Sequence, residues 1–591
     1  MEFRTLKGRE DEKRIRTLVI LVIAVFSVLI LRLIWLQVIL WNTYSEKAAN
    51  NSTRVIPDRA CRGVVYDRNR EVLINNIPSY TVSVIPADLR NKEKVVADLA
   101  KMLDLDEQEI LAKLEKQKYR VFEAVKLKSD VTSQIVSVIE EHSMDLPGVI
   151  VHTEPKRNYT FKESGCHVLG YVGEAGMEEL GAEKYSIGDI LGRAGIEKKY
   201  DKEIRGVNGS REIIVDSFGR QIKPGNTRAF AKGADLMLTI DMKLQKVCED
   251  LVKGRRGAVI AMNPKNGEIY AMVSNPGYDP NIFCSKLDRK EWNTLIENPE
   301  QPFLNRAIGG SYSPGSTYKI VPATAALEEK LLTEKDLFVC HGIYWYSDWN
   351  YNCWKLEGHG SMNIIESLCY SCDIFFYQTG LLAKISKLSE YSKLYGFGSE
   401  TFIDLDGERK GIVPTAEWKE RMHNAHWFPG NTIQLSIGQG YLLATPLQML
   451  NSYNILANNG ALFRPHVVKY VGNKEIRPEE IKSVAIKTET LNTIKKGLWE
   501  AVNRPGGTGW RAKSNFSIAG KTATIENPHG PSHASFIGFA PFNNPEISVI
   551  VFFEGSGSGG GEVAAPVVKA VVESYFKIKK EKYAKSANKE F

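Results

Sequence analysis

One long apolar segment near the N-terminus constrains the fold more than any other feature of the sequence. Residues 18–31 are apolar except for Ser27, and after Arg32 a mostly apolar run continues from 33 to 40. A helix over residues 17–40 would be about 36 Å long, which is enough to cross a hydrocarbon core of about 30 Å with some tilt. The sequence therefore predicts a single transmembrane anchor at 17–40.

The charges that flank this segment predict its orientation. Six basic residues lie in the short segment 1–16 that precedes it: Arg4, Lys7, Arg9, Lys13, Arg14 and Arg16. Because positive charge is retained on the cytoplasmic side, residues 1–16 form a cytoplasmic tail and the bulk of the chain is extracytoplasmic. A buried core helix and a cleaved signal peptide are the alternatives, but no small-x-small cleavage site follows the apolar run.

Length and composition limit what the rest of the chain can be. At 591 residues it is too long for one compact core, and its 43% hydrophobic and 25% charged residues exclude a largely disordered chain and a polytopic membrane protein. The net charge of +7 is spread thinly over this length, so we expect a charge that serves solubility and no nucleic acid partner. Eight cysteines are too few for a disulfide scaffold.

The extracytoplasmic part divides at about residue 230, where a polar segment precedes a strand-like one. From 41 to 230, short strands alternate with charged helices, and a head subdomain is expected at about 87–152. Helical apolar spacing runs through residues 95–117 and again through 131–142. From 231 to 577, strands at both ends of the segment enclose helices, which predicts an α+β domain whose sheet is built from distant segments. Residues 555–561 (GSGSGGG) are expected to form a flexible loop before a last helix at 564–575, and the Lys-rich end, 578–591, to form a frayed basic tail.

Three short motifs in the second domain carry nucleophile chemistry. They are a Ser-x-x-Lys at Ser316 and Lys319, a Ser-x-Asp at Ser371 and Asp373, and a Lys-Thr-x-Thr that begins at Lys521. If Ser316 opens a helix, Lys319 lies one turn on, and a desolvated amine beside a hydroxyl can act as its base. Each motif alone also fits a helix cap or an edge strand, but their order and spacing together are typical of penicillin-interacting serine transferases.

The chain resembles a class B penicillin-binding protein almost from end to end. Asp in place of Asn at 373, and the sequence CWKLEGHG at 353–360, are similar to the elongation-type branch, penicillin-binding protein 2. The resemblance implies a transmembrane helix, an elongated α+β pedestal domain at 41–230, and a transpeptidase domain with a central antiparallel sheet flanked by helices. The other matching segments are LRLIWLQV (31–38), CRGVVYDRN (61–69), LGRAGIEKKYDKEIRG (191–206), LTIDMKLQ (238–245), IGQGYLLATPLQ (437–448) and ASFIGFAP (534–541).

This resemblance implies a serine D,D-transpeptidase that cross-links peptidoglycan stem peptides in cell elongation and maintenance of cell shape. Ser316 would attack the D-Ala-D-Ala carbonyl, Lys319 would accept its proton, and Ser371 would relay a proton to the departing nitrogen. Asp373 and Lys521 would position that network. Thr522 and Thr524 would bind the substrate carboxylate, and β-lactams would acylate the same serine.

Several alternatives remain open at this stage. A D,D-carboxypeptidase would use water in place of the acceptor amine, and a sensor or scaffold would use acylation or contacts to signal. A sporulation-specific transpeptidase is not distinguished from one that acts in vegetative elongation. The resemblance also implies a polytopic shape–elongation–division–sporulation glycosyltransferase as membrane partner.

A group of cysteines and one histidine lies next to the second motif. Cys340, Cys353, His359 and Cys372 have 12, five and 12 residues between them, and three thiolates with one imidazole suit tetrahedral Zn²⁺. A Cys340–Cys353 disulfide and ordinary buried thiols are the alternatives, and Cys369 is a rival ligand. Resemblance to relatives that hold zinc here favours a structural zinc ion, with no organic cofactor.

Two positions depart from the family pattern. Ala523 stands where the family has Gly, and we expect its methyl group to crowd a ligand and to weaken acylation by some bulky β-lactams, which would favour antibiotic resistance. Arg70 replaces the Gly of the pedestal motif, where we expect an altered turn and no more.

Overall fold

The structure is a computed structural model. It describes the chain except for residues 1–2, 46–52, 117–120, 123, 177, 180–184, 186–187, 216–220, 286–288 and 588–591. The chain forms two compact units. The first contains Met1–Ala60, Pro78–Glu154 and Val207–Ala231, and the second contains Cys61–Ile77, Pro155–Gly206 and Lys232–Phe591.

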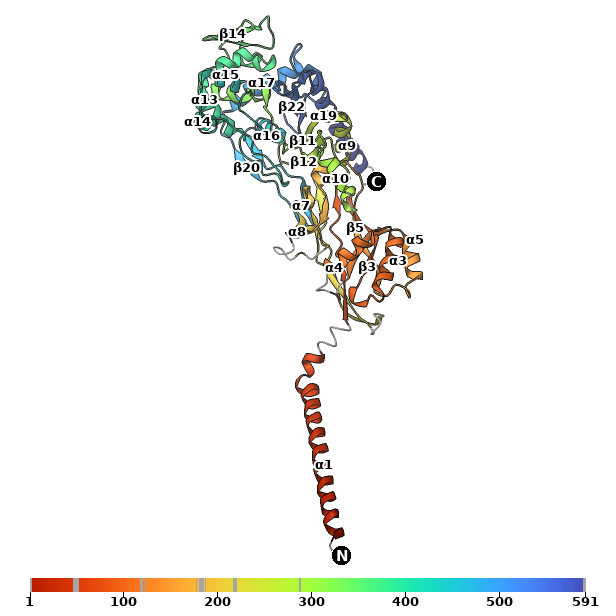
Figure 1. Cartoon of the computed structure of the whole chain (residues 1–591). Helices are drawn as coiled ribbons and strands as arrows, with labels where there is room; N and C mark the ends of the chain where they lie inside the picture. Colours follow the sequence, from red (N-terminus) through yellow and green to blue (C-terminus); the bar gives the residue numbers. More distant parts are fainter. Residues whose placement is uncertain are drawn as a thin grey trace. The chain divides into compact units, whose positions relative to one another are not determined.

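The N-terminal apolar segment of the first unit is one long helix. Helix α1 (Phe3–Ile34) continues into a π-helical turn, η1 (Trp35–Ile39), just after Arg32 (Figure 1). Residues Glu12–Ile39 are long and apolar enough to span a membrane, and none of the most apolar stretch is buried against the rest of the chain. An uncovered apolar helix of this length is stable where lipid surrounds it, which agrees with the predicted anchor.

The rest of the first unit is a mixture of strands and amphipathic helices. Val82 and Val84 of β3 pack with apolar residues of α3, including Val95 and Leu99. The helix predicted as continuous through this region is in fact two helices, because Asp104 takes a left-handed conformation with φ 52° and ends α3. The elements that lie wholly or partly in this unit are β1 (Thr53–Asp58), β3 (Val72–Val84), α3 (Lys92–Leu103), α4 (Glu107–Lys116), β4 (Val125–Val131), α5 (Ser133–Glu141), β5 (Val149–Tyr159), β8 (Gly209–Val215) and β9 (Gln221–Arg228).

A five-stranded antiparallel sheet forms the centre of the second unit. Its order is β12–β11–β23–β22–β21, so strands from both ends of the domain pair side by side, as the sequence predicts. The strands are β11 (Gly257–Met262), β12 (Ile269–Asn275), β21 (Ala519–Ile525), β22 (His533–Ala540) and β23 (Ile547–Phe553). The strands are almost entirely buried, which requires a layer of helices on each face.

Alternate residues of the central strands face two different helical layers. Ile260 belongs to the same buried cluster as residues of α11 (Ile320–Glu328) and α16 (Pro446–Ala457). Val259 belongs instead to a cluster with α9 (Met242–Val252) and α19 (Ala565–Ala587). The layer with α11 also contains α12 (Ile364–Cys369), α13 (Asp373–Leu394), α15 (Pro429–Ser436) and α17 (Thr488–Asn503). The α+β class with a central antiparallel sheet flanked by helices is therefore confirmed.

The C-terminal helix is longer than predicted. Helix α19 does not end at 575 but continues to Ala587, so the described part of the Lys-rich end is helical rather than frayed. Lys579 pairs with Glu546 and Lys582 pairs with Asp241, and these contacts hold the last turns against the domain. Lys, Glu and Ala are also good helix formers.

Two of the segments that carry the family resemblance meet in a buried ionic network of the second unit. Arg62 Nη2 and Arg157 Nε each lie 2.6 Å from a carboxylate oxygen of Glu197. Burial alone would raise the pKa of Glu197, but the two guanidinium groups hold it below its ordinary value. Nearby, Arg70 has φ 66°, a left-handed conformation that favours Gly, so Arg70 fits a turn at some cost in strain.

Candidate active site

The candidate nucleophile lies on a short turn that opens a helix beneath the edge of the sheet. Ser316 is half-buried in a 3-10 turn, η4 (Gly315–Lys319), which leads directly into α11. The sequence predicts that Ser316 opens an α-helix, whereas the structure has a tighter 3-10 turn at this point. Because residues i and i+3 eclipse each other in a 3-10 turn, Lys319 is stacked on the same side as Ser316.

Lys319 joins the first motif to the second. Its side chain is fully buried, and its Nζ donates hydrogen bonds to Ser371 O at 2.8 Å and to Ser371 Oγ at 3.2 Å. It also lies 2.7 Å from Asp373 Oδ1. The amine predicted as the base, the relay hydroxyl and the positioning carboxylate are thus in direct contact, although more than 50 residues separate them in sequence.

Ser371 is held in an unusual backbone conformation between two helices. Its φ is 58°, a left-handed conformation that a non-Gly residue rarely adopts. Helix α12 begins with a capping box formed by Asn363 and Glu366 and ends at Cys369, just before this turn. Helix α13 begins just after the turn, at Asp373. Strain of this kind persists only where the surroundings impose it, and it is concentrated at functional sites.

Lys521 brings the third motif to the same place. It lies on the edge strand β21 and is fully buried. Burial, with the nearby Lys319 ammonium, holds the pKa of Lys521 well below its ordinary value, while Asp373 opposes the shift. This shift is the one expected of an amine that is removed from water and placed near a second cation.

The two predicted carboxylate-binding threonines differ in exposure. Thr524 is exposed and its Oγ1 accepts a hydrogen bond from Gly560 N at 3.4 Å, whereas Thr522 is only 7% exposed. Gly560 starts a short helix, α18 (Gly560–Val563), so the segment predicted as a flexible loop is partly ordered against β21. A Cβ on Gly560 would lie 2.4 Å from Ala523 O, so only Gly fits this close approach.

The methyl group of Ala523 is covered by other side chains of the protein. Ala523 is 2% exposed and packs with Ile525, Phe552 and Tyr312. A Cβ added to Gly315 would lie 3.3 Å from the Ala523 methyl carbon. Residues alternate between the two faces of a strand, so Ala523 lies on the same face of β21 as Lys521. The burial of its methyl group argues against a direct clash with a β-lactam, and the expected weakening of acylation stays a prediction.

We consequently expect Ala523→Gly to change the rate of penicillin acylation by less than about threefold, with a stability loss of about 1 kcal/mol from the lost methyl contacts and the freer backbone. Rapid-quench acylation and thermal unfolding of both proteins test this expectation. A rate that rises tenfold or more in Ala523→Gly for bulky β-lactams alone would restore the crowding hypothesis.

The cysteines and histidine predicted as metal ligands converge beside this site. The ligand atoms of Cys340, Cys353, His359 and Cys372 all lie within 4.8 Å of one another, and all eight cysteines of the chain are free thiols. His359 Nδ1 lies 3.6 Å from Cys340 Sγ and 3.5 Å from Cys353 Sγ. Bonds of about 2.3 Å to sulfur and about 2.1 Å to nitrogen around tetrahedral zinc separate the two ligand atoms by about 3.6 Å. The residues present therefore fit a zinc ion.

The surroundings of Cys353 favour the thiolate form of its side chain. Hydrogen bonding with Cys372 and with His359 lowers the pKa of the Cys353 thiol against the opposing effect of burial. Cys369, the rival ligand, is instead a buried thiol whose pKa burial raises to about 11, and it is outside the group of converging ligands.

The metal-ligand cluster and the catalytic motif share backbone. Cys372 stands between Ser371 and Asp373, and Asp373 Oδ2 accepts a hydrogen bond at 3.0 Å from the backbone N–H of Trp354, the residue after Cys353. Trp354 Nε1 also donates to Tyr370 O at 3.1 Å. Sequence reasoning missed Trp354, and its position next to Cys353 was the only signal that could have pointed to it.

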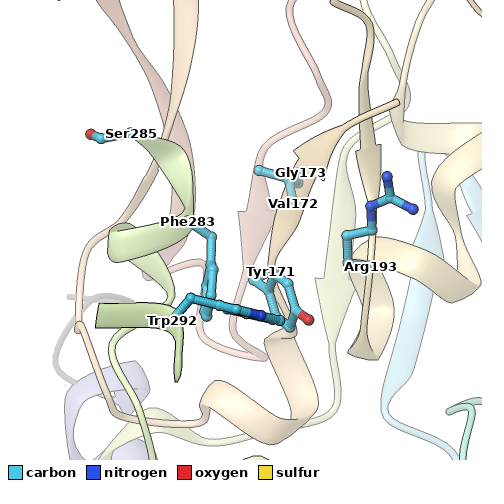
Figure 2. A pocket seen from close by; sticks show the side chains of 7 residues that line it. All are labelled: Tyr171, Val172, Gly173, Arg193, Phe283, Ser285 and Trp292. Carbon is cyan, nitrogen blue, oxygen red and sulfur yellow. The ribbon is translucent and has the colours of Figure 1, made fainter. Parts of the chain in front are cut away.

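An open pocket of about 450 Å³ lies elsewhere in the second unit. It is lined by Tyr171, Val172, Gly173, Arg193, Phe283, Ser285 and Trp292 (Figure 2). The rings of Tyr171 and Phe283 stack on each other, with centroids 4.1 Å apart, and Arg193 is paired with Glu179. None of the three motifs contributes to this pocket, so it is separate from the candidate active site.

Two family models cover most of the chain. The penicillin binding protein transpeptidase domain matches residues 257–573, and the penicillin-binding protein dimerisation domain matches residues 57–238. The first match includes all three motifs, the candidate metal ligands and the whole central sheet.

Individual proteins resemble the chain over nearly its whole length. The peptidoglycan D,D-transpeptidase MrdA of Escherichia coli (strain K12) is 32% identical over 90% of this chain and 89% of the relative. A solved complex between penicillin-binding protein (PBP2) and MreC from Helicobacter pylori has a chain that is 28% identical, with a TM-score of 0.79, and covers 88% of this chain and 99% of that one. A third similar chain belongs to a peptidoglycan synthase complex, whose structure concerns the coordination of polymerization and crosslinking. It is 28% identical, has a TM-score of 0.72, and the match covers 96% of this chain and 98% of that one.

Proposed function

The chain belongs to the class B penicillin-binding proteins of the elongation type, and from that premise we propose which of its residues carry out the reaction. The protein is a membrane-anchored peptidoglycan D,D-transpeptidase. Such an enzyme transfers the acyl group of one stem peptide to an amine of another. The assignments below rest on one observation above all, which is the direct contact of Lys319 with both Ser371 and Asp373.

In the first half of the reaction, Ser316 Oγ attacks the carbonyl carbon of the D-Ala-D-Ala bond. Lys319 Nζ takes the hydroxyl proton, and Ser371 Oγ passes a proton to the nitrogen of the departing D-Ala as the C–N bond breaks. An ester between Ser316 and the donor peptide remains. Asp373 and Lys521 position the Lys319 amine and the Ser371 hydroxyl group. The lowered pKa of Lys521 supports a site that can hold a neutral amine.

In the second half, an amine of another stem peptide attacks this ester and forms the cross-link. Thr522 and Thr524 bind the C-terminal carboxylate of the donor. The backbone N–H groups of Ser316 and Thr524 face the oxyanion, and the loss of one such donor typically lowers the rate by about 10²–10³. A β-lactam reacts with the same serine and stops at the ester.

The metal-ligand cluster has a structural role in this proposal. Cys340, Cys353, His359 and Cys372 would hold one Zn²⁺, which would fix the Ser371 turn and take no part in the chemistry. The contact of Trp354 with Asp373 supports this role, because it connects a ligand-bearing segment to the positioning carboxylate.

The anchor places the enzyme at the membrane with its N-terminus in the cytoplasm. The six basic residues before residue 17 support this orientation. We also propose that the anchor and the first unit pair with a polytopic glycosyltransferase of the shape–elongation–division–sporulation type. The solved peptidoglycan synthase complex supports a polymerising partner, since a chain of that complex resembles 96% of the present chain.

Analysis of the reaction products tests the proposed function. The detergent-solubilised full chain, incubated with peptidoglycan strands that bear pentapeptides, is expected to release D-Ala and to form cross-linked dimers, and penicillin is expected to block both. Mass spectrometry of muramidase digests measures the products. Uncross-linked tetrapeptides as the main product would instead establish a D,D-carboxypeptidase, and the absence of both products alongside a penicillin adduct would indicate a sensor or scaffold.

A further inference from the structure

A short hairpin next to the metal-ligand cluster exposes an unusual concentration of aromatic side chains. It consists of β14 (Ile343–Tyr346) and β15 (Trp349–Asn352), and five of its ten residues are aromatic: Tyr344, Trp345, Tyr346, Trp349 and Tyr351. Trp345 is 66% exposed and Trp349 is 73% exposed. Large exposed aromatic residues that gather in one place mark binding surfaces, whereas single ones need no explanation.

The two faces of the hairpin have different surroundings. Opposite residues of an antiparallel pair lie on the same face, and the register pairs Ile343 with Asn352 and Trp345 with Asn350. All four are exposed. On the other face, the rings of Tyr344 and Tyr351 pack at 6.3 and 5.8 Å from the ring of Tyr377. One face therefore anchors the hairpin to α13, and the face with Trp345 points to solvent.

The hairpin is fixed with respect to the candidate active site. Tyr377 lies one helical turn after Asp373 and donates a hydrogen bond from its hydroxyl group to Asn352 O at 3.0 Å. Two of the metal-ligand cysteines flank the hairpin, Cys340 shortly before it and Cys353 directly after it. In Figure 1 the β14 strand projects beside α15, in the part of the second unit that contains α13. A ligand on this face would be held close to the catalytic groups.

The chemistry of the exposed face selects its ligand. It combines an indole ring with two side-chain amides, and Asp348 in the turn is the only charged residue from 343 to 352. An anionic membrane would require basic residues, and this segment has none. An indole can stack on the C–H face of a sugar ring, and amides can donate to and accept from hydroxyl and acetamido groups.

We propose that this hairpin binds the glycan of the peptidoglycan polymer, with an N-acetylated amino sugar stacked on Trp345 and hydrogen-bonded by Asn350 and Asn352. Trp349 is paired with Tyr346, so it lies on the other face of the hairpin and is not part of this contact. This inference rests on the proposed function, because it names the part of the substrate that the enzyme holds outside its peptide-binding cleft. It explains why the metal-ligand cluster supports a projecting hairpin as well as the Ser371 turn.

Titration with bare glycan strands tests the proposal. Soluble strands, prepared by amidase removal of all stem peptides, are titrated into the detergent-solubilised full chain by isothermal calorimetry. Binding is expected for the native protein, and Trp345→Ala is expected to weaken it about tenfold, because the stacking contact between the indole ring and the sugar is lost. Trp499→Ala is the matched control, since Trp499 is 36% exposed on α17, away from the hairpin.

The same preparations separate this proposal from the proposed function. Penicillin acylation reports whether the catalytic cleft is intact, so a protein that acylates but binds no glycan overturns the hairpin proposal alone. Equal glycan affinity in Trp345→Ala and in the native protein also overturns it. Loss of binding to phosphatidylglycerol vesicles, or loss of self-association in sedimentation, with glycan affinity unchanged, would assign the hairpin to a membrane or to a second copy of the chain.

Discussion

Replacement of Ser316 by Ala is expected to abolish both covalent reaction with penicillin and peptide cross-linking. The variant removes the hydroxyl group that we propose forms the ester, while Lys319, Ser371 and Asp373 keep their mutual contacts. Removal of a catalytic nucleophile typically lowers kcat by about 10⁴–10⁶. Intact mass of the full chain under denaturing conditions, with and without penicillin, measures the adduct directly.

Ser313→Ala provides a matched control for this experiment. Ser313 lies three residues before Ser316, and its hydroxyl donates to Leu442 O at 3.3 Å. It should retain the adduct and the cross-linking rate. An adduct that persists in Ser316→Ala at the native rate would assign the nucleophile to another residue, and the proposed function of the Lys319 and Ser371 groups would fail with it.

The parts of the fold that periodic sequence patterns specify could be predicted. The apolar run that became α1 is long, and the strands near both ends of the second unit are short continuous apolar runs. These patterns depend mainly on which residues must avoid water. The break at Asp104 was missed because apolar spacing continues across it, and only a left-handed residue separates the two helices. The last turns of α19 depend on ion pairs with Asp241 and Glu546, which lie far away in the sequence.

The candidate site shows the same division at the level of single residues. The order of the motifs predicted that Ser316, Ser371 and Lys521 belong together, and the structure brings their segments to one place. The 3-10 turn beneath Ser316, the left-handed φ of Ser371 and the Trp354–Asp373 hydrogen bond depend on tertiary packing, so no local pattern indicates them. The direction of the Ala523 methyl group depends on the register of β21 with its neighbours, so no local pattern indicates that Ile525, Phe552 and Tyr312 cover it.

Loss of one metal ligand is expected to remove the zinc ion and to disturb the catalytic turn. In Cys353→Ser a thiol whose pKa is lowered by its hydrogen bonds with Cys372 and His359 is replaced by a hydroxyl group, which is a poor zinc ligand. Native mass spectrometry should show one Zn²⁺ for each native chain and none for the variant. Because Trp354 is the next residue and donates to Asp373, penicillin acylation should slow by about tenfold or more, as is typical when a group that positions a reactive centre is displaced.

Cys369→Ser tests the identity of the ligands, because Cys369 lies only three residues before Cys372 and is not part of the converging group. This variant should keep its zinc and its acylation rate, whereas Cys372→Ser should lose both. A native chain with no metal and a mass two hydrogens below that of the reduced chain would instead establish a Cys340–Cys353 disulfide. Zinc retained by Cys372→Ser, with the native acylation rate, would remove the metal from the support of the Ser371 turn, and the hydrogen bonds from Lys319 and Trp354 would then have to hold Asp373 unaided.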